Sequence, residues 1–235
     1  MVLGHSICSK ASTFAAHMSK IQGCIFDLDG VIVDTAKYHF MAWKELADNL
    51  GITFTEVDNE RMKGISRRDS LEILLGLGDV HLSDGDKEKY LVSKNDSYLN
   101  FVADMDQSEI LPGVRELLHL LKEQKIKVAL GSASKNARLI LEKVGLTSQF
   151  EAIVDGNDVS KAKPDPEVFL IGAELLATQA DKTVVWEDSA KGIDAALSGG
   201  FKTVGIGSPD YLGHAHRVVK NLIGIDMDYI HELAE

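Results

Sequence analysis

The fold of this chain is decided by residues 25–31, IFDLDGV. A short apolar run ends there in Asp27 and Asp29, two carboxylates at positions i and i+2 that emerge on the same side of an extended chain. Gly30 then permits a tight turn. Two acids that face one point repel each other unless a cation or a proton lies between them, so the pair suggests a metal site and a proton-transfer role. The alternative is an Asp-x-Asp-Gly turn that only closes a hydrogen-bonded loop.

Short apolar runs alternate with helical patterns along the chain from residue 21 onward. This alternation predicts right-handed βαβ units around a mainly parallel sheet, and thus an α/β fold with a Rossmann-like core. The expected strands are residues 23–26, 127–131, 152–154, 183–186 and 202–206. Ligands of such open sheets bind beyond the carboxyl ends of the strands, so the residues after each strand are the candidates for chemistry.

Residues 35–105 break this alternation, because they show three helical patterns and no strand pattern. We interpret them as an inserted α-helical cap domain, placed as a lid over the edge of the sheet. The expected organisation is an N-terminal extension (1–19), a core domain in two parts (20–34 and 106–235) and the cap domain (35–105). Residues 1–19 contain no Asp or Glu, which weakly resembles a transit peptide. We favour a disordered or vector-derived leader, with Met18 as an alternative start.

The composition argues against several classes of function. The formal net charge of −11 over 235 residues repels a nucleic-acid backbone and opposes a polybasic membrane contact. No apolar stretch approaches the roughly 20 residues that span a bilayer. Cys8 and Cys24 lack metal-ligand spacing, and Cys24 lies in an apolar run, which fits a reducing compartment. We expect a cytoplasmic, monomeric protein with a small-molecule substrate and no nucleic-acid or membrane partner.

A group of polar residues follows the second expected strand. Ser132, Ser134, Lys135 and Asn136 stand where a helix is expected to begin. Hydroxyls and amides at a helix N-terminus form a natural phosphate site, although an ordinary N-cap explains Ser134 almost as well. The adjacent lysine favours the phosphate site.

Two further strand ends carry charged residues. Lys163 precedes two prolines, which would hold it rigidly at a helix entrance, while the alternative is a solvated surface lysine. The strand 183–186 ends in Glu187 and Asp188, and carboxylates gathered from separate strands suit magnesium. An N-cap role is the alternative for Asp188. Each signal is weak alone, but the order acid pair, serine, lysine, acid pair at strand ends predicts a phosphoryl-transfer site.

This ordered set resembles the four motifs of the haloacid dehalogenase superfamily over about residues 22–207. The resemblance implies a Mg²⁺-dependent enzyme in which Asp27 is the carboxylate nucleophile and Asp29 is the general acid and base. It also implies that Ser132 and Lys163 hold the transferring phosphoryl group. The implied metal-binding residues are Asp27, Asp29 through its backbone carbonyl, Glu187 and Asp188.

Within that superfamily, the finer pattern resembles the β-phosphoglucomutase family, through residues 34–39, Trp43 and residues 63–70, 94–98, 132–136 and 187–189. This resemblance implies reversible conversion of β-D-glucose 1-phosphate to glucose 6-phosphate through an aspartyl phosphate and β-glucose 1,6-bisphosphate. It assigns His39 and Lys94 to cap closure and substrate sensing, and Arg67 to the non-transferring phosphate. The other implied substrate-binding residues are Thr35, Trp43, Gly64, Ser70, Ser134, Lys135 and Asn136.

Three alternatives stay open at this point. His39 and Trp43 lie four residues apart and could be ordinary packing, and Arg67 and Lys94 could be solvated charges. The same motifs also fit a sugar-phosphate or phosphoglycolate phosphatase, in which water resolves the aspartyl phosphate. A non-catalytic interaction module is the third alternative, and the complete set of acids and the lysine argues against it.

Overall fold

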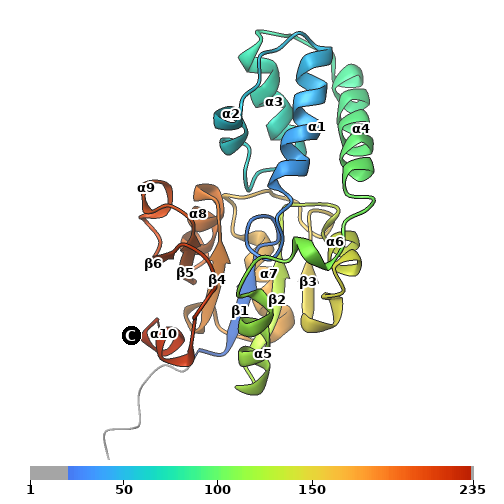
Figure 1. Cartoon of the computed structure of the whole chain (residues 1–235). Coiled ribbons are helices and arrows are strands. Elements are labelled where there is room, and N and C mark those ends of the chain that lie inside the picture. Colours follow the sequence, from blue (N-terminus) through green and yellow to red (C-terminus); the bar gives the residue numbers. More distant parts are fainter. Residues whose placement is uncertain (1–20, 234–235) are drawn as a thin grey trace, which may run out of the picture.

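The computed structural model describes residues 21–233, so the interpretation of residues 1–19 as a leader lies outside the described residues. Within the described range, the chain forms one parallel sheet of six strands in the order β3-β2-β1-β4-β5-β6 (Figure 1). Helices pack on both faces of this sheet. The predicted α/β fold with a Rossmann-like parallel-sheet core is therefore confirmed.

The strands are β1 (Gly23–Phe26), β2 (Lys127–Gly131), β3 (Ala152–Val154), β4 (Thr183–Glu187), β5 (Lys202–Ile206) and β6 (Arg217–Val219). Each of the predicted strands is present, and β4 extends one residue further than predicted, to Glu187. The edge strand β6 was not predicted, because three residues that begin with an arginine give no periodic pattern.

Helices on the two faces of the sheet bury alternate residues of the strands. The helices are α5 (Val114–Glu123), α6 (Ala137–Lys143), α7 (Glu167–Leu176), α8 (Ala190–Ser198), α9 (Pro209–Leu212) and α10 (Met227–Glu232), with the 3₁₀ helices η1 (Gln107–Glu109), η2 (Thr147–Gln149) and η3 (Ala180–Lys182). Successive strand residues point to opposite faces. Cys24 and Phe26 therefore join the cluster under α5, whereas Ile25 joins the cluster under α7.

The segment between β1 and β2 forms the cap helices, α1 (Ala36–Asn49), α2 (Glu56–Glu60), α3 (Arg67–Leu77) and α4 (Asp84–Phe101), which stand above the carboxyl ends of the strands (Figure 1). The three predicted helical patterns correspond to α1, α3 and α4. The prediction missed α2, because five residues are too short to show a period; α2 begins at a capping box of Thr55 and Asp58. The cap helices have a hydrophobic cluster of their own that includes Trp43, Leu46 and Leu71.

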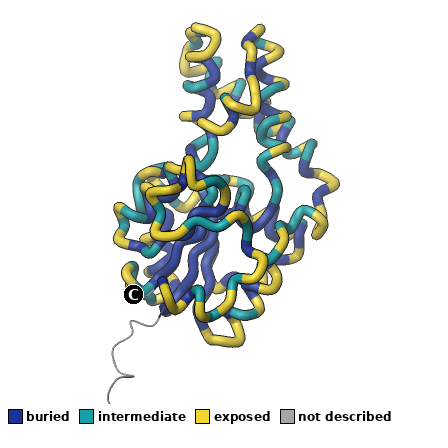
Figure 2. The backbone as a smooth tube through the Cα atoms, turned by 60° about the vertical axis from the view of Figure 1, so that its left-hand side comes forward, coloured by how far each residue is buried: buried dark blue, intermediate teal, exposed yellow. Residues whose placement is uncertain are grey.

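The chain passes between the sheet and the cap helices twice, at residues 27–35 and 102–113 (Figure 2). The two passages lie side by side, because Val33 bridges Ile110 and the Leu111 amide donates to the Ile32 carbonyl at 3.0 Å. In the part of the chain that the structure describes, no helix is long and apolar enough to cross a membrane. The domain boundaries 20–34, 35–105 and 106–235, the monomeric state and the cytoplasmic location stay predictions.

Candidate active site

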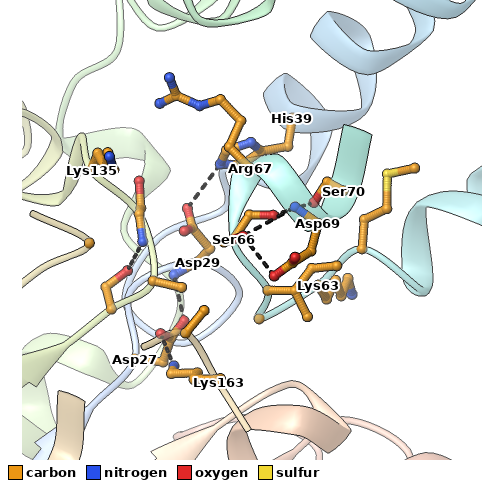
Figure 3. A pocket seen from close by; sticks show the side chains of 18 of the residues that line it. Asp27, Asp29, His39, Lys63, Ser66, Arg67, Asp69, Ser70, Lys135 and Lys163 are labelled. Atoms are coloured by element: carbon orange, nitrogen blue, oxygen red, sulfur yellow. Dashed lines mark hydrogen bonds and ion pairs between the residues drawn. The ribbon is translucent and has the colours of Figure 1, made fainter. Parts of the chain in front are cut away.

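The site is built at the carboxyl end of β1, where Asp27 and Asp29 leave the sheet (Figure 3). The Asp27 amide donates to the Trp186 carbonyl on β4 at 2.9 Å, and the Asp29 amide donates to Oδ2 of Asp27 at 3.1 Å. Gly30 has a φ of +79°, and a Cβ at this position would lie 2.2 Å from Oδ2 of Asp188. Only glycine fits both the backbone conformation and the space. The turn thus brings the β1 carboxylates against the loop that follows β4.

Lys163 lies inside the protein, with a side chain that is 1% exposed. Its Nζ contacts Oδ1 of Asp27 at 2.7 Å, an interaction that is marked in Figure 3. The same Nζ lies 2.8 Å from Oε2 of Glu187. The alternative of a solvated lysine is therefore wrong. Burial by itself lowers the pKa of this ammonium group, but the two carboxylates outweigh burial and hold the Lys163 pKa above its ordinary value. A positive charge is thus fixed against the predicted nucleophile.

Three carboxylates meet beside Lys163. Asp27, Glu187 and Asp188 each offer an oxygen, and these atoms lie within 4.8 Å of one another. Ser189 fixes Glu187, because its amide and its hydroxyl donate to Oε1 at 3.1 and 2.6 Å. Ser189 is also the N-cap of α8, so the alternative of an N-cap role for Asp188 is wrong. Burial and the neighbouring Glu187 raise the pKa of Asp188 to about 7, as expected where acids crowd together.

Asp29 is held from the side of the cap helices. The Thr35 hydroxyl donates to Oδ1 of Asp29, and Nε2 of His39 lies 3.7 Å from the same oxygen. Nδ1 of His39 lies 3.0 Å from Nζ of Lys94. Burial raises the pKa of Asp29 and lowers the pKa of His39 well below its ordinary value. A carboxyl group with a raised pKa beside a cavity is suited to proton transfer.

Lys94 is buried among aromatic rings. Its Nζ lies 4.7 Å from the ring centroid of Trp43 and 5.0 Å from that of Tyr98. Tyr98 stacks on His39 with the ring centroids 4.2 Å apart. Burial, and secondarily the charge of Arg67, lower the pKa of Lys94 to about 7. The alternative of a solvated Lys94 is therefore wrong, and His39 both packs and lines the cavity.

The loop after β2 is organised by its own serines. The Ser134 amide donates to the Ser132 hydroxyl at 3.1 Å, and the Asn136 amide donates to the Ser134 hydroxyl at 3.2 Å. Helix α6 begins at Ala137 with Asn136 as its N-cap, so the alternative of an N-cap role for Ser134 is wrong. The Asn136 side-chain amide donates to Oδ1 of Asn95 on α4 at 3.0 Å. The loop therefore contacts the cap helices directly.

A cavity of about 440 Å³ lies where the cap helices meet the strand ends, a size that suits a small-molecule ligand. The predicted site residues that line it are Asp27, Asp29, His39, Trp43, Gly64, Arg67, Ser70, Lys94, Ser132, Ser134, Lys135, Lys163 and Asp188. Thr35, Asn136 and Glu187 lie behind this lining. Thr35 and Glu187 are fully buried. Thr35 donates a hydrogen bond to Asp29, and Glu187 accepts one from Lys163, so each holds a residue that lines the cavity.

Lys63 lines the cavity and was missed by the sequence analysis, although it belongs to the segment 63–70 that carried the resemblance. Its Nζ lies 3.1 Å from Oε1 of Glu60 and 3.7 Å from Oδ2 of Asp188. The next residue, Gly64, has a φ of +70°, and a Cβ there would lie 2.1 Å from the Ser189 hydroxyl oxygen. This loop therefore lies directly on the loop after β4. Ser66 and Asp69 of the same segment also line the cavity and were likewise not singled out. Other lining residues, which gave no distinguishing sequence signal, are Asn59, Ser160 and Lys161.

The fold and site define a phosphoryl-transfer scaffold, and the comparisons identify its family. The haloacid dehalogenase-like hydrolase family matches residues 24–206, and the chain belongs to this family. β-Phosphoglucomutase of Bacillus subtilis is 38% identical over 214 residues, which cover 90% of this chain and 95% of that protein. The crystal structure of β-phosphoglucomutase from Clostridium difficile is similar with a TM-score of 0.87 and 38% identity, and covers 91% of this chain and 97% of that chain.

A phosphatase is also among the relatives. The phosphorylated carbohydrates phosphatase of Thermotoga maritima is 32% identical over 195 residues, which cover 78% of this chain and 84% of that protein. The predicted superfamily and the predicted resemblance to β-phosphoglucomutase are both confirmed.

Proposed function

We propose that this chain is a β-phosphoglucomutase, which interconverts β-D-glucose 1-phosphate and glucose 6-phosphate through an aspartyl phosphate on Asp27 and β-glucose 1,6-bisphosphate. The observation that carries the proposal is the buried pair of Asp27 and Lys163 at a cavity whose lining also includes His39, Arg67 and Lys94 from the cap helices. The identity to the B. subtilis mutase, 38%, exceeds the 32% identity to the T. maritima phosphatase.

The two carboxyl groups of the β1 turn have separate roles in this mechanism. A bond forms between a carboxylate oxygen of Asp27 and phosphorus while the bond from phosphorus to the sugar oxygen breaks. Asp29 gives its proton to the departing sugar oxygen. In the return step, Asp29 removes a proton from the hydroxyl at the other end of the sugar as that oxygen attacks the aspartyl phosphate. The hydrogen bond from the Asp29 amide to Asp27 keeps the two groups adjacent.

The carboxylates of Asp27, Glu187 and Asp188 fit a magnesium ion, because their oxygens are hard donors that lie within 4.8 Å of one another. These side chains, with the backbone carbonyl of Asp29, would hold the ion. When bound, Mg²⁺ supplies positive charge that stabilises the phosphoryl oxygens. Burial raises the pKa of Asp27 and Lys163 opposes this effect, so the lysine favours the ionised nucleophile.

Two sets of donors suit the two phosphate groups of a sugar bisphosphate. Ser132, directly after β2, and Lys163, which contacts Asp27, line the cavity and would hold the transferring phosphoryl oxygens. Arg67 and Lys135 line the same cavity and would hold the other phosphate. Burial lowers the pKa of Arg67, and an anion beside this guanidinium group would offset the unfavourable burial of its charge.

A mutase must keep water from its aspartyl phosphate until the second sugar hydroxyl arrives. The cap helices supply this protection, because the loop at Gly64 lies on Ser189 and closes one side of the cavity. Lys94, through His39, connects the substrate-binding wall to Asp29. When the cap helices pack on the loop after β4, they would therefore align Asp29 for proton transfer and exclude water at the same time.

The proposal is tested by measuring glucose 6-phosphate and free phosphate together, from β-D-glucose 1-phosphate with Mg²⁺ and a trace of β-glucose 1,6-bisphosphate. Fast isomerisation with negligible phosphate release is expected. Phosphate release without glucose 6-phosphate would make the chain a phosphatase, and the absence of both products would reject the substrate. Asp27→Asn should abolish turnover while circular dichroism stays unchanged, and an active Asp27→Asn variant would refute the nucleophile.

A further inference from the structure

Glu109 joins the two passages that connect the sheet to the cap helices. It is the last residue of η1, in the passage that returns from α4 to the sheet, and its side chain is 14% exposed. Oε1 accepts a hydrogen bond of 2.6 Å from the Tyr38 hydroxyl, and Oε2 lies 2.6 Å from Nζ of Lys37. Both partners belong to the first turn of α1, directly after the outgoing passage. One carboxylate therefore connects the start of α1 to the end of the returning passage.

Backbone contacts place Glu109 at this position. The Asp34 amide donates to the Glu109 carbonyl at 2.9 Å, and the next residue, Ile110, bridges Val33. Although partial burial opposes it, hydrogen bonds from Lys37 and Tyr38 lower the pKa of Glu109 below its ordinary value. The group is therefore an ionised acceptor at neutral pH.

The first turn of α1 also carries the residues that hold Asp29. Thr35 is the N-cap of α1 and donates to Asp29, and His39 follows Tyr38 directly and approaches the same carboxylate oxygen at 3.7 Å. A rotation of this helical turn relative to the sheet would move both contacts together. The bonds to Glu109 oppose such a rotation, because they attach the turn to the neighbouring passage.

We propose that Glu109 is a positioning residue for Asp29, acting through Tyr38 and the first turn of α1. The inference rests on the proposed role of Asp29 as general acid and base. A positioning role differs from a purely structural role in what the loss of Glu109 does. The loss should slow the steps that need a proton from Asp29 and should spare the steps that do not.

The leaving group of the phosphoryl donor distinguishes these steps. A sugar oxygen departs as a strong base and needs a proton, whereas p-nitrophenolate is a weak base and departs without one. Formation of the aspartyl phosphate from β-glucose 1,6-bisphosphate should therefore depend on Glu109. Its formation from p-nitrophenyl phosphate should not.

The experiment measures single-turnover formation of the phosphoenzyme from both donors in the full chain. The variants are Glu109→Ala, Glu109→Gln and Tyr38→Phe. Glu72→Ala is the matched control, because Glu72 forms a 2.8 Å ion pair with Lys87 between α3 and α4, away from both passages. Should the wild type not accept the bisphosphate, glucose 6-phosphate is the sugar donor, because its sugar oxygen also departs as a strong base.

Glu109→Ala should slow transfer from the sugar phosphate about tenfold, the order of loss that a small misplacement of a catalytic group causes, and transfer from p-nitrophenyl phosphate less than twofold. Glu109→Gln, which keeps an acceptor for Tyr38, should recover most of the lost rate. Tyr38→Phe removes only the hydroxyl and should reproduce the leaving-group effect, even if Glu109→Ala fails to fold. Equal losses with both donors, or rates for Glu109→Ala and Tyr38→Phe that match Glu72→Ala, would overturn the proposal.

Discussion

Nζ of Lys163 lies 2.7 Å from Oδ1 of Asp27, although 136 residues separate them in the chain. The same ammonium group contacts Glu187 at 2.8 Å, and both contacts are buried. In a low-dielectric environment such a lysine offsets the repulsion of the neighbouring acids, and in the proposed mechanism it would also present a donor to the phosphoryl group. The proposal therefore couples stability and catalysis at this one side chain.

Lys163→Met should lower both properties. Two buried carboxylates would lose their counter-charge, which destabilises the fold by about 3 to 5 kcal/mol. The rate should fall by at least about 10²-fold, since one preorganised donor to developing charge is lost. Urea denaturation and steady-state kinetics measure the two effects. The control is Lys89→Met, which removes an ion pair of equal length, 2.7 Å, from a side chain that is 78% exposed. Similar losses in both variants would contradict the special role of Lys163.

Gly64→Ala should prevent the cap helices from seating on the loop after β4. The added Cβ would lie 2.1 Å from the Ser189 hydroxyl oxygen, so turnover should fall about tenfold or more and phosphate release should rise relative to isomerisation. Gly51→Ala is the matched control, because Gly51 has the same φ of +70° and a Cβ added there would meet no atom within 4 Å. Both variants should lose about 1 kcal/mol of stability from the left-handed backbone, and only Gly64→Ala should lose activity.

Lys94 should make the stability depend on pH. Its pKa is lowered from 10.5 to about 7 by burial, so between these values the unfolded chain binds more protons than the folded chain. Stability should therefore rise with pH through this window, and Lys94→Met should remove the rise. The difference between wild type and variant should change by about 2 to 3 kcal/mol between pH 6 and pH 9. Denaturation midpoints at the two pH values measure it, with the exposed Lys122→Met as control. A constant difference would show that the buried ammonium group does not titrate in this window.

Removal of magnesium should abolish turnover and lower the melting temperature. Asp27, Glu187 and Asp188 repel one another when ionised, and an ion that binds only the folded state stabilises it by about 2.7 kcal/mol at a concentration of 100 times its Kd. Calorimetric scans with Mg²⁺ and with EDTA measure this shift. In Asp188→Asn the shift should shrink strongly. An undiminished shift in that variant would place the ion elsewhere.

The sequence determined much of the fold and the chemical residues of the site. Asp27, Ser132 and Glu187 could be found because apolar runs mark strands, and the carboxyl ends of parallel strands meet at one edge of a sheet. Lys163 lies in the loop between β3 and α7 and was found instead from the prolines that follow it and from the family resemblance. The β1 turn was also predictable, since Gly30 allows a backbone conformation that other residues resist. The strand pattern is local, so the sequence by itself carried it.

Short elements gave no such local signal. The strand β6 begins with an exposed arginine and therefore lacks the wholly apolar run that revealed β3, a strand of the same length. The helix α2 has five residues, fewer than a hydrophobic period needs to become visible. The helix N-caps were also ambiguous, because serine, aspartate and asparagine side by side can each cap a helix. Packing selected Asn136 for α6 and Ser189 for α8.

Only the tertiary structure decided which distant side chains meet. The pairing of Lys163 with Asp27 and Glu187 depends on how the strands assemble into the sheet. The approach of Lys63 to Asp188 depends on how the cap helices sit on the sheet, and the attachment of Tyr38 to Glu109 depends on the two passages lying side by side. These contacts join residues far apart in the chain, and no periodicity of the sequence encodes them. Local sequence patterns therefore predict which residues form the candidate site. The charge states of these residues and their alignment arise from burial and from non-local packing.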